Sequence, residues 1–305
     1  MLSICIPIYN VLVFDLLSSL RKQINEQNLN CEIICIDDNS TEQIKIQNIP
    51  AIAFTNQYIQ LKKNVGRSAI RNLFLDYTNQ PYLLFLDCDV RIQDDSFLVN
   101  YLSAIQENHG LICGGHEYVN LKAEKKFRLK WNYGRKRESK SIKERQKKPQ
   151  KSFMPSNFVI KKGILAENPF DTRLSQYGHE DTLFAYNLGC AGIKFHHIKN
   201  HVEITDLELN ETYLKKTEQG IYNLKKILEF TKYNPQLIDN VSLLRFYFKS
   251  KKNGSLLIIN LFLGLFFNRI RKKLQHGNTS LFLFDLYKLV YFTKVMKADR
   301  NQIIK

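Results

Sequence analysis

The chain lacks both of the glycine-rich loops that most often identify nucleotide-binding proteins. It has 13 glycines among 305 residues, with no GxGxxG after its first predicted strand and no GxxxxGKS/T anywhere. Those loops hold dinucleotides and nucleoside triphosphates through backbone N–H groups. The sequence therefore gives no support to an ordinary dinucleotide-binding or P-loop protein. A bound nucleotide would have to be held by acidic and polar residues at strand ends.

Zinc-type cysteine pairs and a leader sequence are also lacking. The six cysteines are scattered, mostly within apolar runs, and none shows paired CxxC spacing. We interpret them as small core residues in a reducing compartment. The first ten residues, MLSICIPIYN, have neither the basic segment nor the long apolar segment of a signal peptide. We therefore expect a cytoplasmic protein.

Acidic residues are few in comparison with basic ones. There are 29 Asp and Glu against 45 Lys and Arg, which gives a formal charge of +16. This excess indicates an anionic partner: nucleic acid, phospholipid headgroups or a phosphorylated substrate. With 44% hydrophobic and 24% charged residues, the chain can still bury a core.

Apolar runs alternate with helical patterns over the first 90 residues. A strand–helix–strand–helix order predicts an α/β fold with a largely parallel sheet and helices on both faces. The expected strands are residues 3–8, 32–36, 58–61 and 83–86, and the expected helices are residues 12–24 and 67–77.

The run LLFLDCDV, residues 83–90, ends a buried strand in two acids. Residues two apart on an extended chain point the same way, so Asp87 and Asp89 are expected to project together. The carboxyl edge of an open α/β sheet is where ligands usually bind. Two carboxylates there suit Mg²⁺ or Mn²⁺ bridging a diphosphate. The alternative is an ordinary turn, in which Asp is common.

Four motifs in order resemble those of family 2 glycosyltransferases, which are inverting enzymes of the GT-A fold, Rossmann-like with a mostly parallel sheet. The resemblance continues downstream and covers roughly residues 1–205. The motifs are IPIYN (6–10), DDNS (37–40), NVGRSAIRN (64–72) and DCD (87–89), followed by SNF (156–158), FD (170–171) and YGHED (177–181).

The resemblance implies a pocket for a nucleotide-sugar, which we expect to be UDP-linked, and a divalent metal held by Asp89 with Asp87 nearby. Each motif also has a structural alternative: a turn aromatic, a helix cap or a solvated helix arginine. The implied nucleotide-sugar-binding residues are Pro7, Tyr9, Asp37, Asp38, Asn64, Gly66, Arg71, Asp87 and Cys88.

The pair Glu180 and Asp181 precedes a helix-like pattern. In the family this pair marks the acceptor site and its aspartate is the catalytic base. Inverting transfer is a direct displacement by an acceptor hydroxyl, so a carboxylate must take the proton. We assign the base to Asp181, with Glu180 supporting orientation. The structural alternative is a pair of first-turn acids favoured by the helix dipole.

The third metal ligand departs from the family pattern. Many members carry a histidine where this chain has Ile204, and His201 lies three residues earlier. Either His201 takes the role in a shifted register, or Asp89, the diphosphate and water hold the metal alone.

Residues 122–151 form a strongly basic segment. It carries fourteen Lys and Arg against three Glu. One interpretation is a solvated loop kept extended by like charges. The other, which the position of the equivalent family insert favours, is a cradle for an anionic acceptor or a membrane surface.

The chain changes character after residue 207. We expect a helix at 207–233 to close a catalytic domain at residues 1–235, followed by a basic and apolar helical extension at 236–305. Residues 255–267 are strongly apolar but too short to span a bilayer, and basic residues follow them. Amphipathic helices at a membrane interface fit this composition, as do helices packed on the domain or in a dimer.

The resulting prediction is a peripheral enzyme on the inner face of the cell membrane. It would transfer a hexosyl or N-acetylhexosaminyl group from a nucleotide-sugar to a surface glycan or its lipid-linked precursor. One alternative is a nucleotidyltransferase of similar fold, which predicts a basic glycine-rich loop after the first strand that residues 10–14 lack. Another alternative is a non-enzymatic polyanion-binding protein, but that function would leave the acids at the strand ends without a role. Nucleic acid is not the expected partner.

Overall fold

The structure, a computed structural model, describes residues 1–119, 123–174, 177–205 and 207–298. The chain forms two compact units. The sheet unit comprises Met1–Val119, Arg137–Ser175 and Glu180–Asp206, and the helical unit comprises Asn120–Lys136, Gln176–His179 and Leu207–Lys305.

A seven-stranded sheet is the centre of the sheet unit. Its order is β3-β2-β1-β4-β8-β6-β9. The neighbours β3, β2, β1 and β4 are all parallel, and β8 runs antiparallel to both β4 and β6. The predicted α/β fold with a mostly parallel sheet is confirmed. The strands are β1 (Leu2–Ile8), β2 (Cys31–Asp37), β3 (Gln57–Gln60), β4 (Tyr82–Leu86), β6 (Leu111–Cys113), β8 (Asn157–Lys161) and β9 (Phe195–His197).

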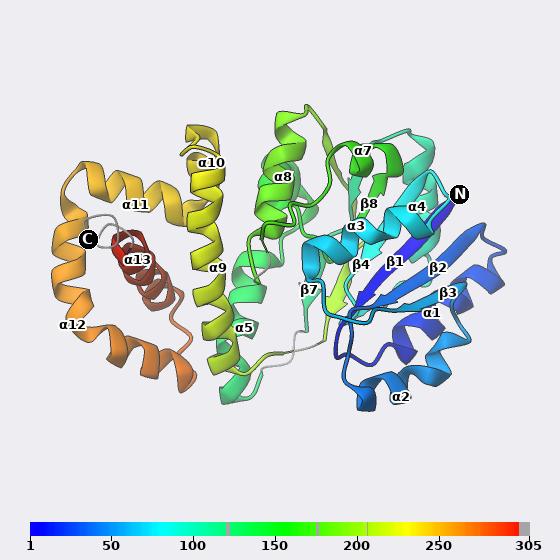
Figure 1. The fold of residues 1–305 in the computed structure, drawn as a ribbon, viewed down its shortest axis with the longest axis horizontal. Coiled ribbons are helices and arrows are strands. Elements are labelled where there is room, and N and C mark those ends of the chain that lie inside the picture. Colours follow the sequence, from blue (N-terminus) through cyan, green and yellow to red (C-terminus); the bar gives the residue numbers. More distant parts are fainter. Residues whose placement is uncertain (120–122, 175–176, 206, 299–305) are drawn as a thin grey trace. The chain divides into compact units, whose positions relative to one another are not determined.

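Helices cover the sheet on both faces, which explains why its central strands are apolar throughout. Every residue of β4 is buried. Helix α3 packs against β1, β2 and α7, whereas α1 packs against α2 and α4 (Figure 1). The helices are α1 (Phe14–Glu26), α2 (Glu42–Ile52), α3 (Arg67–Tyr77), α4 (Phe97–Gln106), α7 (Lys162–Glu167) and α8 (Glu180–Cys190).

Aromatic side chains fill the core between the sheet and its helices. Phe85 of β4 stacks on Phe158 of β8 at 5.1 Å between ring centroids, and Phe74 of α3 meets Phe85 edge-on at 5.7 Å. All three rings are fully buried. Burial of one such ring contributes roughly 1.5–3 kcal/mol, so this cluster fixes α3 and β8 against β4.

A second, three-stranded sheet follows the acidic end of β4. Its order is β5-β10-β7, with β10 antiparallel to β5 and parallel to β7. Ile204 of β10 lies opposite Val90 of β5, the residue after Asp89. This small sheet therefore fixes the backbone that leaves the acidic pair. Its strands are β5 (Val90–Arg91), β7 (His116–Tyr118) and β10 (Val202–Ile204).

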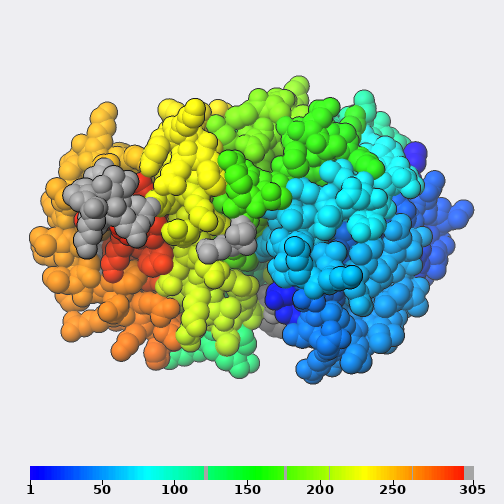
Figure 2. All heavy atoms as spheres, in the orientation of Figure 1, coloured from blue at the N-terminus to red at the C-terminus, as the bar shows by residue number. Residues whose placement is uncertain are grey.

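The helical unit has its own apolar core. Helix α13 packs against α9, α11 and α12 (Figure 1), and Tyr287 and Phe284 of α13 are buried among them. The atoms of α12, orange in Figure 2, form part of the outer surface of this unit. No helix among the described residues combines the length and apolarity needed to cross a membrane. The helices are α5 (Arg128–Tyr133), α9 (Asn210–Phe230), α10 (Pro235–Asn240), α11 (Ser242–Lys252), α12 (Ser255–Gln275) and α13 (Leu281–Ala298).

Helix α9 is the element closest to the predicted domain boundary. The sequence assigns it to the catalytic domain, which is expected to end at residue 235. In the structure α9 shares a core with α12 and α13, and the helical unit takes up the chain again at Leu207. The assignment of residues 207–235 to the catalytic domain stays a prediction.

The basic segment is folded rather than extended, so the alternative of a loop kept extended by like charges is wrong, while the favoured cradle for an anionic acceptor or a membrane stays a prediction. Between residues 125 and 152 it forms α5, α6 (Ile142–Lys147) and three shorter helical turns. Arg145 is 5% exposed, and its guanidinium donates to the carbonyls of Cys113 at 3.0 Å and Ile198 at 2.8 Å. These carbonyls accept hydrogen bonds from the buried guanidinium, so α6, the helix that carries Arg145, is anchored within the sheet unit.

Candidate active site

The carboxyl ends of β1, β2 and β4 meet at one edge of the sheet. The strands β3, β2, β1 and β4 are parallel, but the order in which the chain adds them to the sheet changes side between β1 and β4. In open α/β sheets, such a switch point is where ligands usually bind. Tyr9 follows β1 and is 51% exposed there, Asp37 ends β2, and Asp87 follows β4. The predicted donor residues therefore come from adjacent strands.

Asp38 holds the loop that leads into α3. Its carboxylate accepts hydrogen bonds from the N–H groups of Val65 at 2.7 Å and Gly66 at 3.0 Å, and its carbonyl accepts one from Asn64 at 3.1 Å. Burial raises the pKa of Asp38, and the two backbone donors oppose that rise. Asp38 is 4% exposed, so it stabilises the loop before α3 rather than forming an open surface.

Asp37 is also committed to local structure. It is fully buried, and its carboxylate accepts from the N–H of Ser40 at 2.6 Å and the hydroxyl of Tyr58 at 3.4 Å. Burial, Asp37 and Cys35 together raise the pKa of Tyr58. Of the predicted pocket residues, Tyr9 and Asn64 are the exposed ones.

Cys88 and Pro7 lie beneath the same edge and are each partly buried. Burial first, and then the charge of Asp89, raises the pKa of Cys88 to about 12, although the backbone N–H of Tyr9 opposes the rise. Cys88 is therefore a neutral thiol at pH 7. It fixes the spacing of its acidic neighbours and contributes no charge.

Two arginines on one face of α3 hold Asp87. The guanidinium of Arg71 donates to Asp87 Oδ1 at 2.8 Å, and Arg67 Nη2 lies 3.5 Å from Asp87 Oδ2. Arg71 is 1% exposed, so its guanidinium is held against Asp87 and offers little open surface. Arg67 also reaches Glu180, with Nε 3.3 Å from Oε1.

Arg67 is the site residue that the sequence reasoning missed. It joins Asp87 of the donor motif to Glu180 of the acceptor motif, which lies 93 positions after Asp87 in the chain. A signal for it existed: Arg67 is four residues before Arg71, and residues i and i+4 share a helix face. One charged row on α3 therefore connects the two motifs.

Asp181 combines burial with a neighbouring carboxylate. Desolvation first, and then the charge of Glu180, raises its pKa from 3.8 to about 6. The N–H of Thr182, which donates to Asp181 Oδ1 at 2.7 Å, and the charges of Arg67 and Arg71 oppose the rise. A carboxylate with this pKa is ionised at pH 7 and is a stronger base than an ordinary aspartate.

The candidate metal ligands are Asp89 and Asp87. Their oxygens are the ligand type that Mg²⁺ and Mn²⁺ prefer, and the two arginines partly neutralise Asp87. The carbonyl of Asp89 accepts hydrogen bonds from the N–H and hydroxyl of Thr205. Within the described ranges, no third Asp, Glu, His or Cys clusters with the pair at metal-ligand spacing.

The structure does not bring His201 to the acidic pair. His201 precedes β10, and its Nε2 lies 3.4 Å from Glu117 Oε2 of β7. The residue beside the acidic turn is Ile204, paired with Val90. The other possibility that the sequence left open, a metal held by Asp89, diphosphate and water, stays a prediction.

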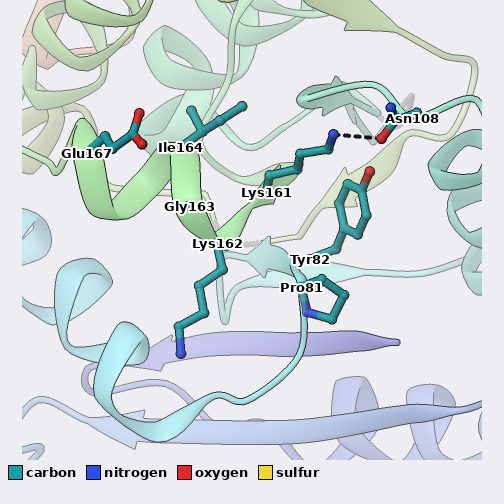
Figure 3. A pocket seen from close by; sticks show the side chains of 8 residues that line it. All are labelled: Pro81, Tyr82, Asn108, Lys161, Lys162, Gly163, Ile164 and Glu167. Atoms are coloured by element: carbon teal, nitrogen blue, oxygen red, sulfur yellow. Dashed lines mark hydrogen bonds between the residues drawn. The ribbon is translucent and has the colours of Figure 1, made fainter.

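Two other features lie away from this edge. Glu107, His109 and His196 form a possible metal cluster, but the two imidazoles stack at 13° between ring planes, so their in-plane lone pairs do not converge on one point. A hollow of about 540 Å³ lies at the amino end of β4, opposite the acids (Figure 3). Its Lys161 already donates to Asn108 at 2.6 Å and its Lys162 to the carbonyl of Thr78.

The fold and the acidic switch point together define a GT-A glycosyltransferase. The family model "Glycosyl transferase family 2" matches residues 3–168, which is more than half of the chain and includes β1 to β8. The chain therefore belongs to glycosyltransferase family 2.

Curated relatives match over part of their length. A glycosyltransferase of Haemophilus influenzae is 31% identical over 119 residues, which are 38% of this chain and 46% of the relative. A teichoic acid poly(glycerol phosphate) polymerase of Staphylococcus epidermidis is 28% identical over 128 residues, or 40% and 17% of the two chains. The chain thus spans less than half of either relative.

Solved structures share the fold at low identity. S. aureus TarS in complex with UDP-GlcNAc has a TM-score of 0.52 and 17% identity, covering 99% of this chain and 92% of that one. Glucosyl-3-phosphoglycerate synthase from Mycobacterium tuberculosis, in complex with Mn²⁺, UDP and glucosyl-3-phosphoglycerate, has a TM-score of 0.50 and 16% identity, covering 74% and 79%.

The Gly66 loop gives a prediction for stability. Gly66 has φ 84° and ψ 167°, a region that essentially only glycine occupies. The variant Gly66→Ala should lose about 1–3 kcal/mol of unfolding free energy in urea titrations, because alanine is strained in this backbone conformation and the N–H held by Asp38 moves. In contrast, Gly163→Ala in α7, where a Cβ meets no atom within 4 Å, should be neutral or stabilising. Equal losses in both variants would contradict the assigned role of the loop.

Proposed function

We propose that the chain is an inverting glycosyltransferase that moves a hexosyl or N-acetylhexosaminyl group from a UDP-sugar to a hydroxyl of a surface glycan or its lipid-linked precursor. Family membership supports sugar transfer. The observation that carries the finer proposal is the contact of Arg67 with both Asp87 and Glu180, beside the strengthened base Asp181. Structural neighbours crystallised with UDP and UDP-GlcNAc support the choice of donor.

The donor half of the mechanism depends on the ends of β1 and β4. Tyr9 is exposed beside the crevice and offers a ring face to the base, while the Asp38-held loop forms the adjacent wall. Arg71 and Arg67 fix the carboxylate of Asp87 before any ligand arrives, which lowers the cost of ordering the site on binding. The guanidinium of Arg67, whose side chain is 41% exposed, lies beside Asp87 and would stabilise negative charge on a leaving diphosphate held there.

A divalent metal fits the same edge. Asp89 and Asp87 would hold Mn²⁺ or Mg²⁺, which supplies Lewis-acid stabilisation of the departing diphosphate. Crystal structures of the mycobacterial synthase contain Mn²⁺ or Mg²⁺ with UDP, which supports this ligand class. The placement of His201 beside Glu117 supports a metal site without a histidine.

The acceptor half depends on the start of α8. The acceptor hydroxyl attacks the anomeric carbon on the face opposite the leaving group, and Asp181 removes its proton. Glu180, 5% exposed and bound to Arg67, orients the pair and raises the basicity of Asp181 through its charge. Inversion at the anomeric carbon follows from this single displacement.

Donor binding can be tested by thermal shift. UDP with Mn²⁺ at 100 times its dissociation constant should raise the Tm by about 5 °C, because it binds only the folded chain. The variant Asp89→Asn should lose most of this shift. The control Asp95→Asn removes the same charge from an exposed residue whose hydrogen bond to Gln27 uses its backbone carbonyl, and it should respond as the natural chain does. If UDP, GDP and dTDP all fail to shift the Tm with either metal, the donor site is wrong.

Replacing the base separates catalysis from binding. The variant Asp181→Asn should abolish transfer and keep the thermal shift with UDP and Mn²⁺. It should also raise the unfolding free energy at pH 7 by about 1–2 kcal/mol, because the folded chain no longer buries a charge whose pKa the fold raises. Near-normal turnover would move the base elsewhere, with Glu180→Gln as the next variant to assay.

The pH profile gives an independent check. Asp181 must be ionised to act, so log kcat/KM should rise with unit slope below about pH 6 and then level off. The stability term has the opposite sense: neutral Asp181 favours the fold, so this contribution is fully present below the unfolded pKa and is lost as the pH rises through about 6. An acidic limb centred near pH 4 would contradict the assignment of Asp181 as base.

A further inference from the structure

One helix of the helical unit is apolar on two opposite faces. Phe267, Ile270 and Leu274 of α12 are buried against α9 and α13. The other face consists of large apolar side chains that are 45–79% exposed, which is unusual because such residues normally pack inward. These exposed side chains, here called the α12 outer face, are Leu257, Ile258, Leu261, Phe262, Leu265 and Phe266.

The spacing of the α12 outer face is regular. Its members recur at intervals of one, three and four residues, which places them along one stripe of the helix. The polar residue between them, Asn260, turns its amide back to the carbonyl of Leu256 at 2.7 Å. A Cβ at Gly264 would meet nothing within 4 Å, so the helix is open there as well. The stripe is therefore continuous, apolar and uncovered by other described residues.

The charged residues that flank the stripe in the sequence are all basic. From residue 240 to residue 284 the chain has no Asp or Glu and eight Lys and Arg. Lys251 and Lys252 lie just before α12, and Arg269, Lys272 and Lys273 lie in its last turns, all exposed. A second copy of this chain would present the same positive charge and be repelled. A surface of anionic headgroups above acyl chains complements both the charge and the apolar stripe.

We propose that the α12 outer face is a docking surface for an anionic lipid bilayer, with α12 lying in the plane of the membrane. Because its inner face is buried in the core of the helical unit, the helix can offer lipid only one side. Leucine and phenylalanine side chains then enter the acyl boundary while the basic residues at both ends contact phosphate groups. This inference is independent of the proposed transfer reaction, since no residue of the candidate active site takes part.

The test uses the full chain and point variants, because α12 and α13 contribute to the core and their removal would disturb the fold. Sedimentation is measured with vesicles of phosphatidylcholine alone and of phosphatidylcholine with about one third phosphatidylglycerol. The chain should bind the anionic vesicles and bind neutral ones at least about tenfold more weakly. Raising the salt concentration should weaken binding without abolishing it, because burial of the stripe is not screened.

Paired variants separate the stripe from the charges. The double variant Leu261→Gln, Leu265→Gln should bind anionic vesicles about tenfold or more weakly, since both side chains leave water on docking. Its control, Ile46→Gln with Ile49→Gln, removes two side chains of 63% and 58% exposure from α2 and should bind normally. Lys272→Gln with Lys273→Gln should lose about fivefold per lysine, and the control Lys194→Gln with Lys199→Gln, which changes two exposed lysines of the sheet unit, should lose much less.

Three results would overturn the proposal. The first is a full chain that remains in solution beside anionic vesicles. The second is a Leu261→Gln, Leu265→Gln variant that binds like the natural chain while circular dichroism shows it folded, or that loses no more than its α2 control. The third is light scattering that shows a dimer of the natural chain and a monomer of that variant, which would assign the α12 outer face to a second copy.

Discussion

The buried guanidinium of Arg71 is the interaction on which the site depends. It is 1% exposed, stacks 5.5 Å above Phe170 and donates to Asp87 at 2.8 Å. A buried cation without a carboxylate would be strongly destabilising, so the fold is stable only with Asp87 in this position. The N–H of Asp87 is held as well, by the carbonyl of Ser156 at 3.1 Å. The backbone and the carboxylate of Asp87 are thus both fixed before any ligand binds.

That constraint extends from the donor motif to the acceptor motif. Arg67 lies one turn before Arg71 and divides its guanidinium between Asp87 and Glu180. Glu180 in turn contributes to the raised pKa of Asp181. A change in the charge on Asp87 should therefore alter the pKa of Asp181, the proposed base, through Arg67 and Glu180. In the proposed reaction, charge leaves with the diphosphate as the base takes a proton, and a shared arginine suits both events.

The two units differ in where they place their apolar side chains. In the sheet unit, helices on both faces make the central strands apolar throughout, and the polar chemistry is confined to strand ends. In the helical unit, α12 is apolar on a buried side and on an exposed side, which packing within the chain does not explain. The basic residues beside its exposed stripe agree with the excess positive charge of the whole chain.

The sequence by itself determined the first four strands and the family: helix Arg67–Tyr77 is as predicted, and β1, β2, β3 and β4 lie within one or two residues of their predicted bounds. Local periodicity and strand-end acids carry this information because they depend on near neighbours. Tertiary structure alone decided which acids are open and which are buried. Asp38 accepts a hydrogen bond from the loop before α3, and the buried Arg71 donates to Asp87. Arg145 of the basic segment donates to the carbonyl of Cys113, and His201 lies beside Glu117 instead of the acidic pair. These outcomes depend on contacts between residues far apart in the chain, which no local pattern encodes.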